Sequence, residues 1–394
     1  MPQPGLLGAA PMKQNSPYLY TLLWTVGTVV FIVAASYAVG ALARFLSRLA
    51  GRTRMHQENT FAGYFFASPW IVGFLIFVVA PMLASLYWSF TDYRIGTPPT
   101  WVWLQNYIRL ITDDREFRGS LVNTLFLTVF GLPLQIGFAL FLAVLLNQRT
   151  RGERAFRMTF YLPVILGFNA AVLLCWRLML NASNGIIDQL IRLASQSFPP
   201  FSYLNRAIIY VVEVVNGIFL GLTNGNFTLL TRVYESGFPA ANRVPLWIQS
   251  PLWSKMSVIL LMVWISGSMM LIFLAGLNAI PRELQEAAEV DGANDWQQFW
   301  RIKFPLLTPY IFYNLIVGLI AALQIFEPVY VLYRDNQPLA PSAYSMVYYL
   351  YQATFRFNTI GYGSAISWLL LMIIAIVTFI QFRLQDKWVQ YDLY

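Results

Sequence analysis

One segment of the sequence combines carboxylates, small residues and aromatic residues between two prolines. It runs from Pro281 to Pro305 and has Gly292 near its middle. Pro281 suits a first helical position, because its missing N–H would have no intrahelical acceptor there, and glycine readily adopts the left-handed conformation that ends a helix. Asn294 and Gln297 have the spacing of a capping pair for a second helix. We therefore predict two short helices with a bend at Gly292.

Such a helix pair offers docking chemistry rather than catalytic chemistry. An amphipathic helix buries its apolar face in a groove of a partner, and we expect the pair to expose Ala287, Ala288, Trp296 and Phe299 beside carboxylates. Glu and Ala are also simply good helix formers, so composition alone is compatible with a solvated helix. The residues predicted to carry docking are Glu286, Ala287, Ala288, Asp291, Gly292, Trp296 and Phe299.

Two ionisable residues, Arg177 and Glu327, lie near the ends of apolar stretches. A charge within hydrocarbon costs a few kcal/mol unless it reaches the interface or finds a partner, so each either snorkels or lines a solute path. Pro328 favours the second role for Glu327, because a helix break there would open backbone groups to a cavity. Polar residues within spans more often make helix-packing hydrogen bonds. The candidates for a solute path are Trp264, Ser268, Gln324 and Glu327.

Other kinds of site are excluded by the residue inventory. Cys175 is the only cysteine and His56 the only histidine, which excludes a disulfide framework and a Cys/His metal site. A phosphate-binding loop needs a lysine directly after glycine, and none of the four lysines follows glycine. We expect no catalytic residue, no metal and no cofactor in this chain.

The composition indicates a membrane protein. Of the 394 residues, 58% are hydrophobic and only 11% charged, whereas soluble domains average about 25% charged residues. The net charge of +8 is spread between uncharged stretches, so nucleic-acid binding is not expected. About 20 helical residues cross the hydrocarbon. Stretches of this length predict an all-α, multi-pass protein with seven spans, at 14–43, 59–91, 119–148, 158–176, 256–281, 304–326 and 357–382.

The distribution of Lys and Arg predicts the orientation. Cytoplasmic loops carry an excess of these residues. There are 13 Lys+Arg in the 71 residues of 44–60, 147–157, 278–308 and 383–394, but only 7 in the 72 residues of 1–17, 91–118 and 333–359. The N-terminus is therefore expected outside and the C-terminus in the cytoplasm. The first apolar stretch is too long for a signal peptide, so we expect it to remain as an anchor.

The docking segment resembles the EAA loop of ABC-importer permeases. The matching residues are Glu286-Ala287-Ala288-x-x-x-Gly292, preceded by Ile280-Pro281 and followed by Ile302-x-Phe304-Pro305. Over about 61–384 the chain is similar to the larger permease subunit of carbohydrate-type importers, such as the maltose and glycerol-phosphate systems. The further matching segments are Ser89-Phe90-Thr91-Asp92, Asn106-Tyr107, Asn123-Thr124-Leu125 and Phe273–Leu277.

This resemblance implies a type I importer with six core helices plus one N-terminal extra helix. It implies a second related permease, two cytoplasmic ATPase subunits that hydrolyse ATP and hold the two EAA loops, and an extracytoplasmic solute-binding protein. The cargo would be a sugar or a related polar solute, and the membrane would be the plasma (inner) membrane of a bacterium or archaeon. The chain departs from the family at Phe304, where leucine is usual, and at Tyr333–Pro338, where Thr-x-Gly-Gly-Pro is frequent.

The predicted organisation follows from these assignments. We expect a disordered tail at 1–17, an extra transmembrane helix at 18–43, and a permease domain at 61–384 with its coupling loop at 278–308. An extracytoplasmic insertion at about 196–245, with a helix at Ala207–Leu222, is not explained by the resemblance. The alternative function is a secondary transporter or an intramembrane enzyme. Either would need coupling or catalytic groups within the spans.

Overall fold

The computed structural model describes residues 17–147, 153–181, 185–197, 207, 210, 247–248, 251–333 and 344–390. Three predictions fall wholly or mainly outside the described residues. They concern residues 1–16 of the tail, most of the insertion at 196–245 and most of the helix at Ala207–Leu222. Internal contacts divide the chain into two compact units, Met1–Tyr87 and Trp88–Tyr394, which we describe separately.

Seven spans are compatible with the described residues. Five helices are long and apolar enough to cross a membrane, namely Tyr20–Leu49, Arg54–Ser89, Arg115–Asn147, Thr308–Tyr333 and Ile360–Lys387. Two further pairs are bent, Ala155–Leu166 with Ala170–Met179 by 107° and Trp253–Trp264 with Gly267–Ala279 by 44°. The predicted number is reached when each bent pair counts as one span.

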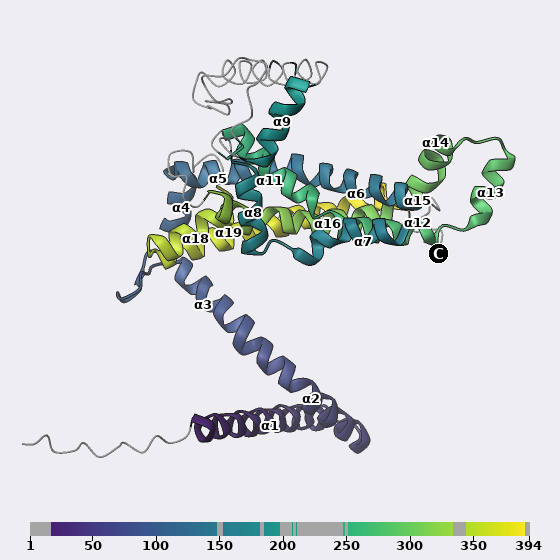
Figure 1. The fold of residues 1–394 in the computed structure, drawn as a ribbon. Helices are drawn as coiled ribbons and strands as arrows, with labels where there is room; N and C mark the ends of the chain where they lie inside the picture. The colour runs from purple at the N-terminus through teal and green to yellow at the C-terminus, as the bar shows by residue number, and fades with distance from the viewer. Residues whose placement is uncertain are drawn as a thin grey trace, which may run out of the picture. The chain divides into compact units, whose positions relative to one another are not determined.

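The first unit is a pair of antiparallel helices that continues into a further helix. Its elements are α1 (Pro17–Leu49), α2 (Arg54–Phe74), the π-helical turn η1 (Leu75–Val79) and α3 (Ala80–Ser89), whose last two residues belong to the second unit. Figure 1 shows α1 and α2 side by side. They approach closely because Gly40 has no side chain: a Cβ atom there would lie 3.0 Å from the Phe61 ring. The Tyr37 ring also meets the Phe61 ring edge to face, with 5.6 Å between centroids.

The second unit is a helical bundle with one two-stranded hairpin. The antiparallel strands are β1 (Thr91–Asp92) and β2 (Thr100–Trp101). The helices are α4 (Gln105–Thr112), α5 (Arg115–Phe126), η2 (Leu127–Gly131), α6 (Leu132–Asn147), α7 (Glu153–Leu166), α8 (Ala170–Met179), α9 (Ile186–Ser197), α11 (Pro251–Trp264), α12 (Gly267–Ala279), α13 (Arg282–Val290), α14 (Asp295–Gln298), η4 (Phe299–Lys303), α15 (Phe304–Leu306), α16 (Thr308–Leu323), α17 (Glu327–Tyr333), α18 (Met346–Tyr351), η6 (Gln352–Arg356), α19 (Ile360–Leu384) and η7 (Gln385–Lys387).

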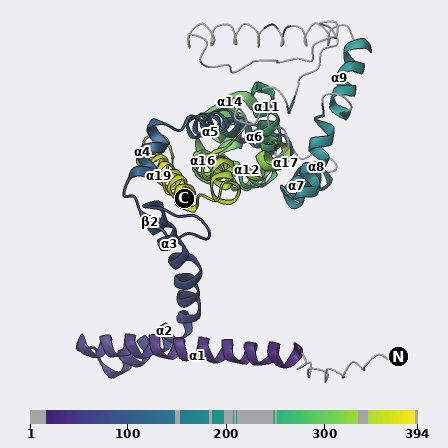
Figure 2. The same ribbon diagram turned by 90° about the vertical axis from the view of Figure 1, so that its left-hand side faces the viewer.

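The centre of the bundle is formed by α6, α12 and α16, which pack against one another (Figure 2). Their facing residues are apolar and buried, including Ala139, Phe273 and Leu319. Gly318 lets α16 approach Leu132 and Met269, because these side chains occupy the place of a Cβ atom. Figure 1 shows α13 and α14 at one end of these helices, and α4 and α18 at the opposite end. Different helices therefore form the two ends of the bundle.

The fourth predicted span is not a continuous helix. The stretch 158–176 is divided between α7 and α8, which are bent by 107°. Gly167 takes φ +60° after α7, a conformation that glycine adopts without the steric cost of a Cβ atom. The Asn169 side chain then accepts a hydrogen bond from the Val172 N–H at 2.9 Å and caps α8. Hydropathy could not predict this break, because apolar character continues through it.

Candidate functional site

The coupling loop, 278–308, contains the predicted bend between two helices. Gly292 has φ +80° between α13 and α14, so the predicted positive φ is confirmed. The capping pair is also confirmed: the Gln297 N–H donates to the Asn294 side chain at 2.8 Å, and the Asn294 N–H donates to Gln297 Oε1 at 2.9 Å. Pro281 occupies the N-cap rather than the predicted first helical position, since α13 begins at Arg282. The bend is thus held by local hydrogen bonds on its second helix.

The face that α13 exposes differs from the predicted one. Ala287 is exposed, but Ala288 is buried at 8% exposure. The reason is that the chain folds back after Gly292, and the Ala293 N–H donates to the Ala288 carbonyl at 2.9 Å. The residues at helical spacing on the exposed face are Glu283, Glu286, Ala287 and Val290. Val290 is 88% exposed, and the sequence reasoning missed it although its position three residues after Ala287 points to the same face.

The aromatic residues after the bend form one cluster. Trp296 is 69% exposed, as predicted, whereas Phe299 is only half-exposed, contrary to the prediction. Phe299 loses exposure because it packs on Trp300 and Phe304, with 5.2 and 6.2 Å between ring centroids. Trp300, which was not predicted as a site residue, is 46% exposed. Asp291 is also exposed.

The two ends of the coupling loop are packed against each other. A Cβ atom on Gly276 of α12 would lie 2.7 Å from the Tyr310 ring and 2.9 Å from Leu307. Leu307 is fully buried, and the Gln390 N–H donates to the Thr308 hydroxyl at 3.0 Å. A displacement of the loop would therefore reach α12 and α16 together, since both helices meet at its base.

The four predicted solute-path residues fall into two groups. Ser268, Gln324 and Glu327 are exposed, whereas Trp264 is half-buried against Trp176 of α8, with 5.5 Å between ring centroids. The helix break expected beside Pro328 is confirmed, because α16 ends at Leu323 and α17 begins at Glu327. Among the described residues, no hydrogen bond joins these four side chains to one another.

Arg177 forms a hydrogen bond with the neighbouring helix α17 and does not only extend to the membrane interface. It is half-buried on α8, and its Nη1 donates to the Val331 carbonyl of α17 at 3.4 Å. The bond links the bent fourth span to the segment that follows the α16 break. Arg177 therefore contributes to packing between helices.

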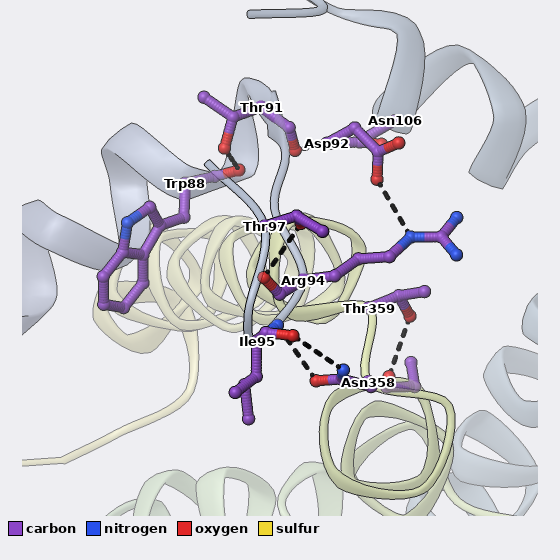
Figure 3. A network of polar contacts seen from close by, with 10 residues as sticks. Trp88, Thr91, Asp92, Arg94, Ile95, Thr97, Asn106, Asn358 and Thr359 are labelled. Carbon is purple, nitrogen blue, oxygen red and sulfur yellow. Dashed lines mark hydrogen bonds and ion pairs between the residues drawn. The ribbon is translucent and has the colours of Figure 1, made fainter. Parts of the chain in front are cut away.

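The motif residue Asn106, together with Asn358, ties the hairpin into the opposite end of the bundle (Figure 3). The Asn106 side chain donates to the Ser89 and Thr91 carbonyls at 2.9 and 3.0 Å. Asn358 accepts from the Ile95 N–H at 3.1 Å and donates to the Ile95 carbonyl at 3.3 Å. These bonds fix the hairpin against the start of α19.

Two further motif residues, Asn123 and Thr124, hold the start of α18. The Asn123 side chain donates to the Tyr344 carbonyl at 3.1 Å, and the Met346 N–H donates to the Thr124 hydroxyl at 2.8 Å. The Ser345 hydroxyl in turn donates to the Ile325 carbonyl in the break after α16, at 2.7 Å. The motifs that carry the resemblance thus perform structural tasks at this end.

Asp114 organises the same end and was missed by the sequence reasoning. Its carboxylate caps α5 by accepting from the Phe117 N–H at 2.8 Å, and it also accepts from the hydroxyls of Tyr349, at 2.6 Å, and Tyr362. Burial, followed by the hydrogen bond to Asp114, raises the pKa of Tyr349. The spacing of an N-cap could have identified Asp114 itself. Its tyrosine partners are more than 230 residues away.

Comparisons with known proteins agree with this architecture. A probable ABC transporter permease protein of Bacillus subtilis, YesP, is 37% identical over 343 residues, covering 86% of this chain and 96% of that protein. The arabinooligosaccharides transport system permease protein AraP of the same species is 30% identical, over 86% of this chain and 94% of its own length.

A solved structure shares the fold. A chain in the crystal structure of a bacterial alginate ABC transporter, in complex with an alginate pentasaccharide-bound periplasmic protein, matches 84% of this chain and 96% of its own. The TM-score is 0.62 and the sequence identity is 20%, so this likeness concerns the fold alone.

A family model spans most of the bundle. Residues 115–391 match the model described as binding-protein-dependent transport system inner membrane component. The match includes the coupling loop with its bend at Gly292, both helices at its base, and the break that precedes Glu327. The chain therefore belongs to the family of binding-protein-dependent transport system inner membrane components, the permease subunits of ABC importers.

Proposed function

We propose that the chain forms half of the translocation pore of an importer for a sugar or a related polar solute. The proposal includes a second related permease, two ATPase subunits that hydrolyse ATP, and an extracytoplasmic solute-binding protein. The name of the arabinooligosaccharide permease supports the solute class, and the solved alginate transporter supports a binding-protein partner, since it is in complex with one. The family supplies the pore subunit rather than the ATPase.

The exposed face of α13 carries this proposal. Glu283, Glu286, Ala287 and Val290 form a face of small, apolar and acidic residues at the end of the bundle. A helix of this kind suits a groove in a partner, where the apolar residues become buried and the carboxylates orient the approach. Closing of the ATPase pair would displace α13. Because the loop base packs α12 against α16, the displacement would reach the pore helices.

Docking of α13 on the ATPase subunits would also assign the coupling loop to the cytoplasm. Segments 278–308 and 383–390, which hold five of the 13 Lys and Arg counted in the predicted cytoplasmic connections, lie at the end of the second unit that carries α13 and α14, whereas the hairpin and α18 lie at the opposite end (Figure 1). An excess of Lys and Arg is typical of cytoplasmic loops. We propose a C-terminus in the cytoplasm and an N-terminus outside.

We further propose that Trp264, Ser268, Gln324 and Glu327 contribute to the solute path. Exposure of Ser268, Gln324 and Glu327 supports this, as does the helix break between Leu323 and Glu327, because solute sites in transporters often lie where a helix is interrupted. The secondary transporter and the intramembrane enzyme have no observation in their favour.

The experiment combines co-purification with uptake. Ala287→Arg should reduce the ATPase that co-purifies with the assembled permease by about tenfold or more, because a long charged side chain cannot enter a well-packed groove. Arg94→Gln, at the opposite end of the bundle, should leave it unchanged and serves as the control. Uptake of labelled oligosaccharides should fall in parallel. Normal ATPase association and uptake with Ala287→Arg would refute docking through this face.

A further inference from the structure

A cluster of arginines surrounds the turn between α1 and α2. Arg44 and Arg48 lie one helical turn apart on α1, Arg52 lies in the turn, and Arg54 begins α2; all four are exposed. Glu58 is the only carboxylate between residues 44 and 58. It pairs with Arg44 at 3.9 Å and with Arg54 at 3.6 Å. Within the described residues, Arg48 and Arg52 form no ion pair.

The turn that presents these arginines is locally well defined. Gly51 has φ +68°, its N–H donates to the Arg48 carbonyl at 3.1 Å, and the Arg52 N–H donates to the Ser47 carbonyl at 3.2 Å. This is the Schellman pattern that ends helices. The Gln57 side chain also donates to the Arg52 carbonyl at 2.8 Å. The four guanidinium groups therefore extend from a hydrogen-bonded turn.

The length of α1 places the cluster at the membrane surface. The apolar helix Tyr20–Leu49 has 30 residues, of which about 20 are enough to cross the hydrocarbon. The remainder extends into the headgroup region, where Arg44 emerges and Arg48 lies about 6 Å further along the axis. Phe45, Leu46 and Leu49 between them are also exposed. Cationic and apolar side chains in alternation are typical of a segment lying at a lipid interface.

We propose that Arg44, Arg48, Arg52 and Arg54 form a binding surface for anionic phospholipid headgroups. Guanidinium groups bind phosphate oxygens through paired hydrogen bonds, and clustered arginines beside a transmembrane helix attract anionic lipid. The single carboxylate offsets little of this attraction, because exposed ion pairs are weak. The surface belongs to the first unit alone. The proposed topology assigns this surface to the cytoplasmic leaflet, and only that assignment depends on the proposed function.

Native mass spectrometry of the assembled transporter tests the proposal. Complexes are released from nanodiscs made of equal parts phosphatidylcholine and phosphatidylglycerol, and the retained lipids are identified. The wild type should retain phosphatidylglycerol preferentially. The preference should fall roughly fivefold for each arginine neutralised, and therefore most clearly in an Arg48→Gln, Arg52→Gln double variant. Arg48→Lys with Arg52→Lys should largely keep it, and Glu58→Gln should increase it only slightly.

A matched pair of substitutions provides the control. Arg115→Gln with Arg118→Gln removes the same charge from exposed positions on α5 and should leave the lipid preference unchanged. Equal retention by the Arg48→Gln, Arg52→Gln variant and the wild type would overturn the proposal, as would equal losses in the lysine variant. In vesicles of phosphatidylcholine alone, uptake by the Arg48→Gln, Arg52→Gln variant should equal that of the wild type. Failure of wild-type uptake in vesicles that contain both lipids would count against the proposed function instead.

Discussion

Gly292 determines whether the two helices of the coupling loop can bend away from each other. Its φ is +80°, and nothing lies within 4 Å of the place that a Cβ atom would occupy. A larger side chain there would meet no neighbour, so its effect would come from the backbone alone. This separates Gly292 from glycines such as Gly318, where a Cβ atom would have to displace the Leu132 and Met269 side chains.

Gly292→Val should uncouple the permease from its ATPase. A β-branched residue with positive φ costs about 1 kcal/mol or more, which favours a straightened bend and a displaced α13. The variant should reach the membrane in normal amount, co-purify with less ATPase and show little binding-protein-stimulated ATP hydrolysis.

Two substitutions make this test specific. Gly292→Asn should be milder, because asparagine tolerates the left-handed region. Glu286→Ala should also be milder, because a charge at the rim of an interface acts mainly on association and orientation. Full stimulated hydrolysis and transport by Gly292→Val would exclude a coupling role for this bend.

At the scale of elements, one carboxylate joins several helices at the bundle end opposite the coupling loop. Asp114 connects the start of α5 to Tyr349 on α18 and Tyr362 on α19. Arg109 of α4 lies over the Tyr362 ring, 5.0 Å from its centroid. Four helices therefore meet at a single polar cluster.

Asp114→Ala should lower the free energy of unfolding by about 3 kcal/mol, since it removes an N-cap and two hydrogen bonds to a charged acceptor. Thermal unfolding of the purified protein in detergent measures the loss. Asp113→Ala removes the neighbouring, exposed carboxylate and should have little effect. An equal fall in melting temperature for both variants would contradict the assigned role.

The same cluster predicts a dependence on alkaline pH. Burial and the bond to Asp114 raise the pKa of Tyr349 in the folded protein, above the value of about 10 expected in the unfolded chain. Its stabilisation is therefore fully present below about pH 10 and is lost as the pH rises further. Tyr349→Phe should show a weaker loss of melting temperature above pH 10 than the wild type.

At the scale of the whole molecule, the proposed topology puts the coupling-loop end of the bundle in the cytoplasm. Cysteine labelling in intact cells tests this orientation. The exposed Cys175 is first replaced by serine, since it would otherwise react. We then expect Thr97→Cys, in the hairpin, to react with a membrane-impermeant thiol reagent, and Asp295→Cys, in the coupling loop, to resist it.

Inside-out vesicles supply the control for this prediction. There the pattern should reverse, so that Asp295→Cys reacts while Thr97→Cys does not. This step separates protection by the membrane from protection by a bound ATPase. Labelling of Asp295→Cys from outside intact cells would invert the proposed topology.

The sequence by itself determined the features that depend on short-range interactions or on composition. The helical membrane class follows from apolar stretches, and the bend at Gly292 with the Asn294 and Gln297 cap involves residues adjacent in the chain. The tertiary structure decided which face of α13 is exposed, how α7 and α8 are bent, and which tyrosines reach Asp114. These features depend on which distant segments of the chain meet, as Asp114 and Tyr362 do. Neither local spacing nor apolar composition specifies such a partner.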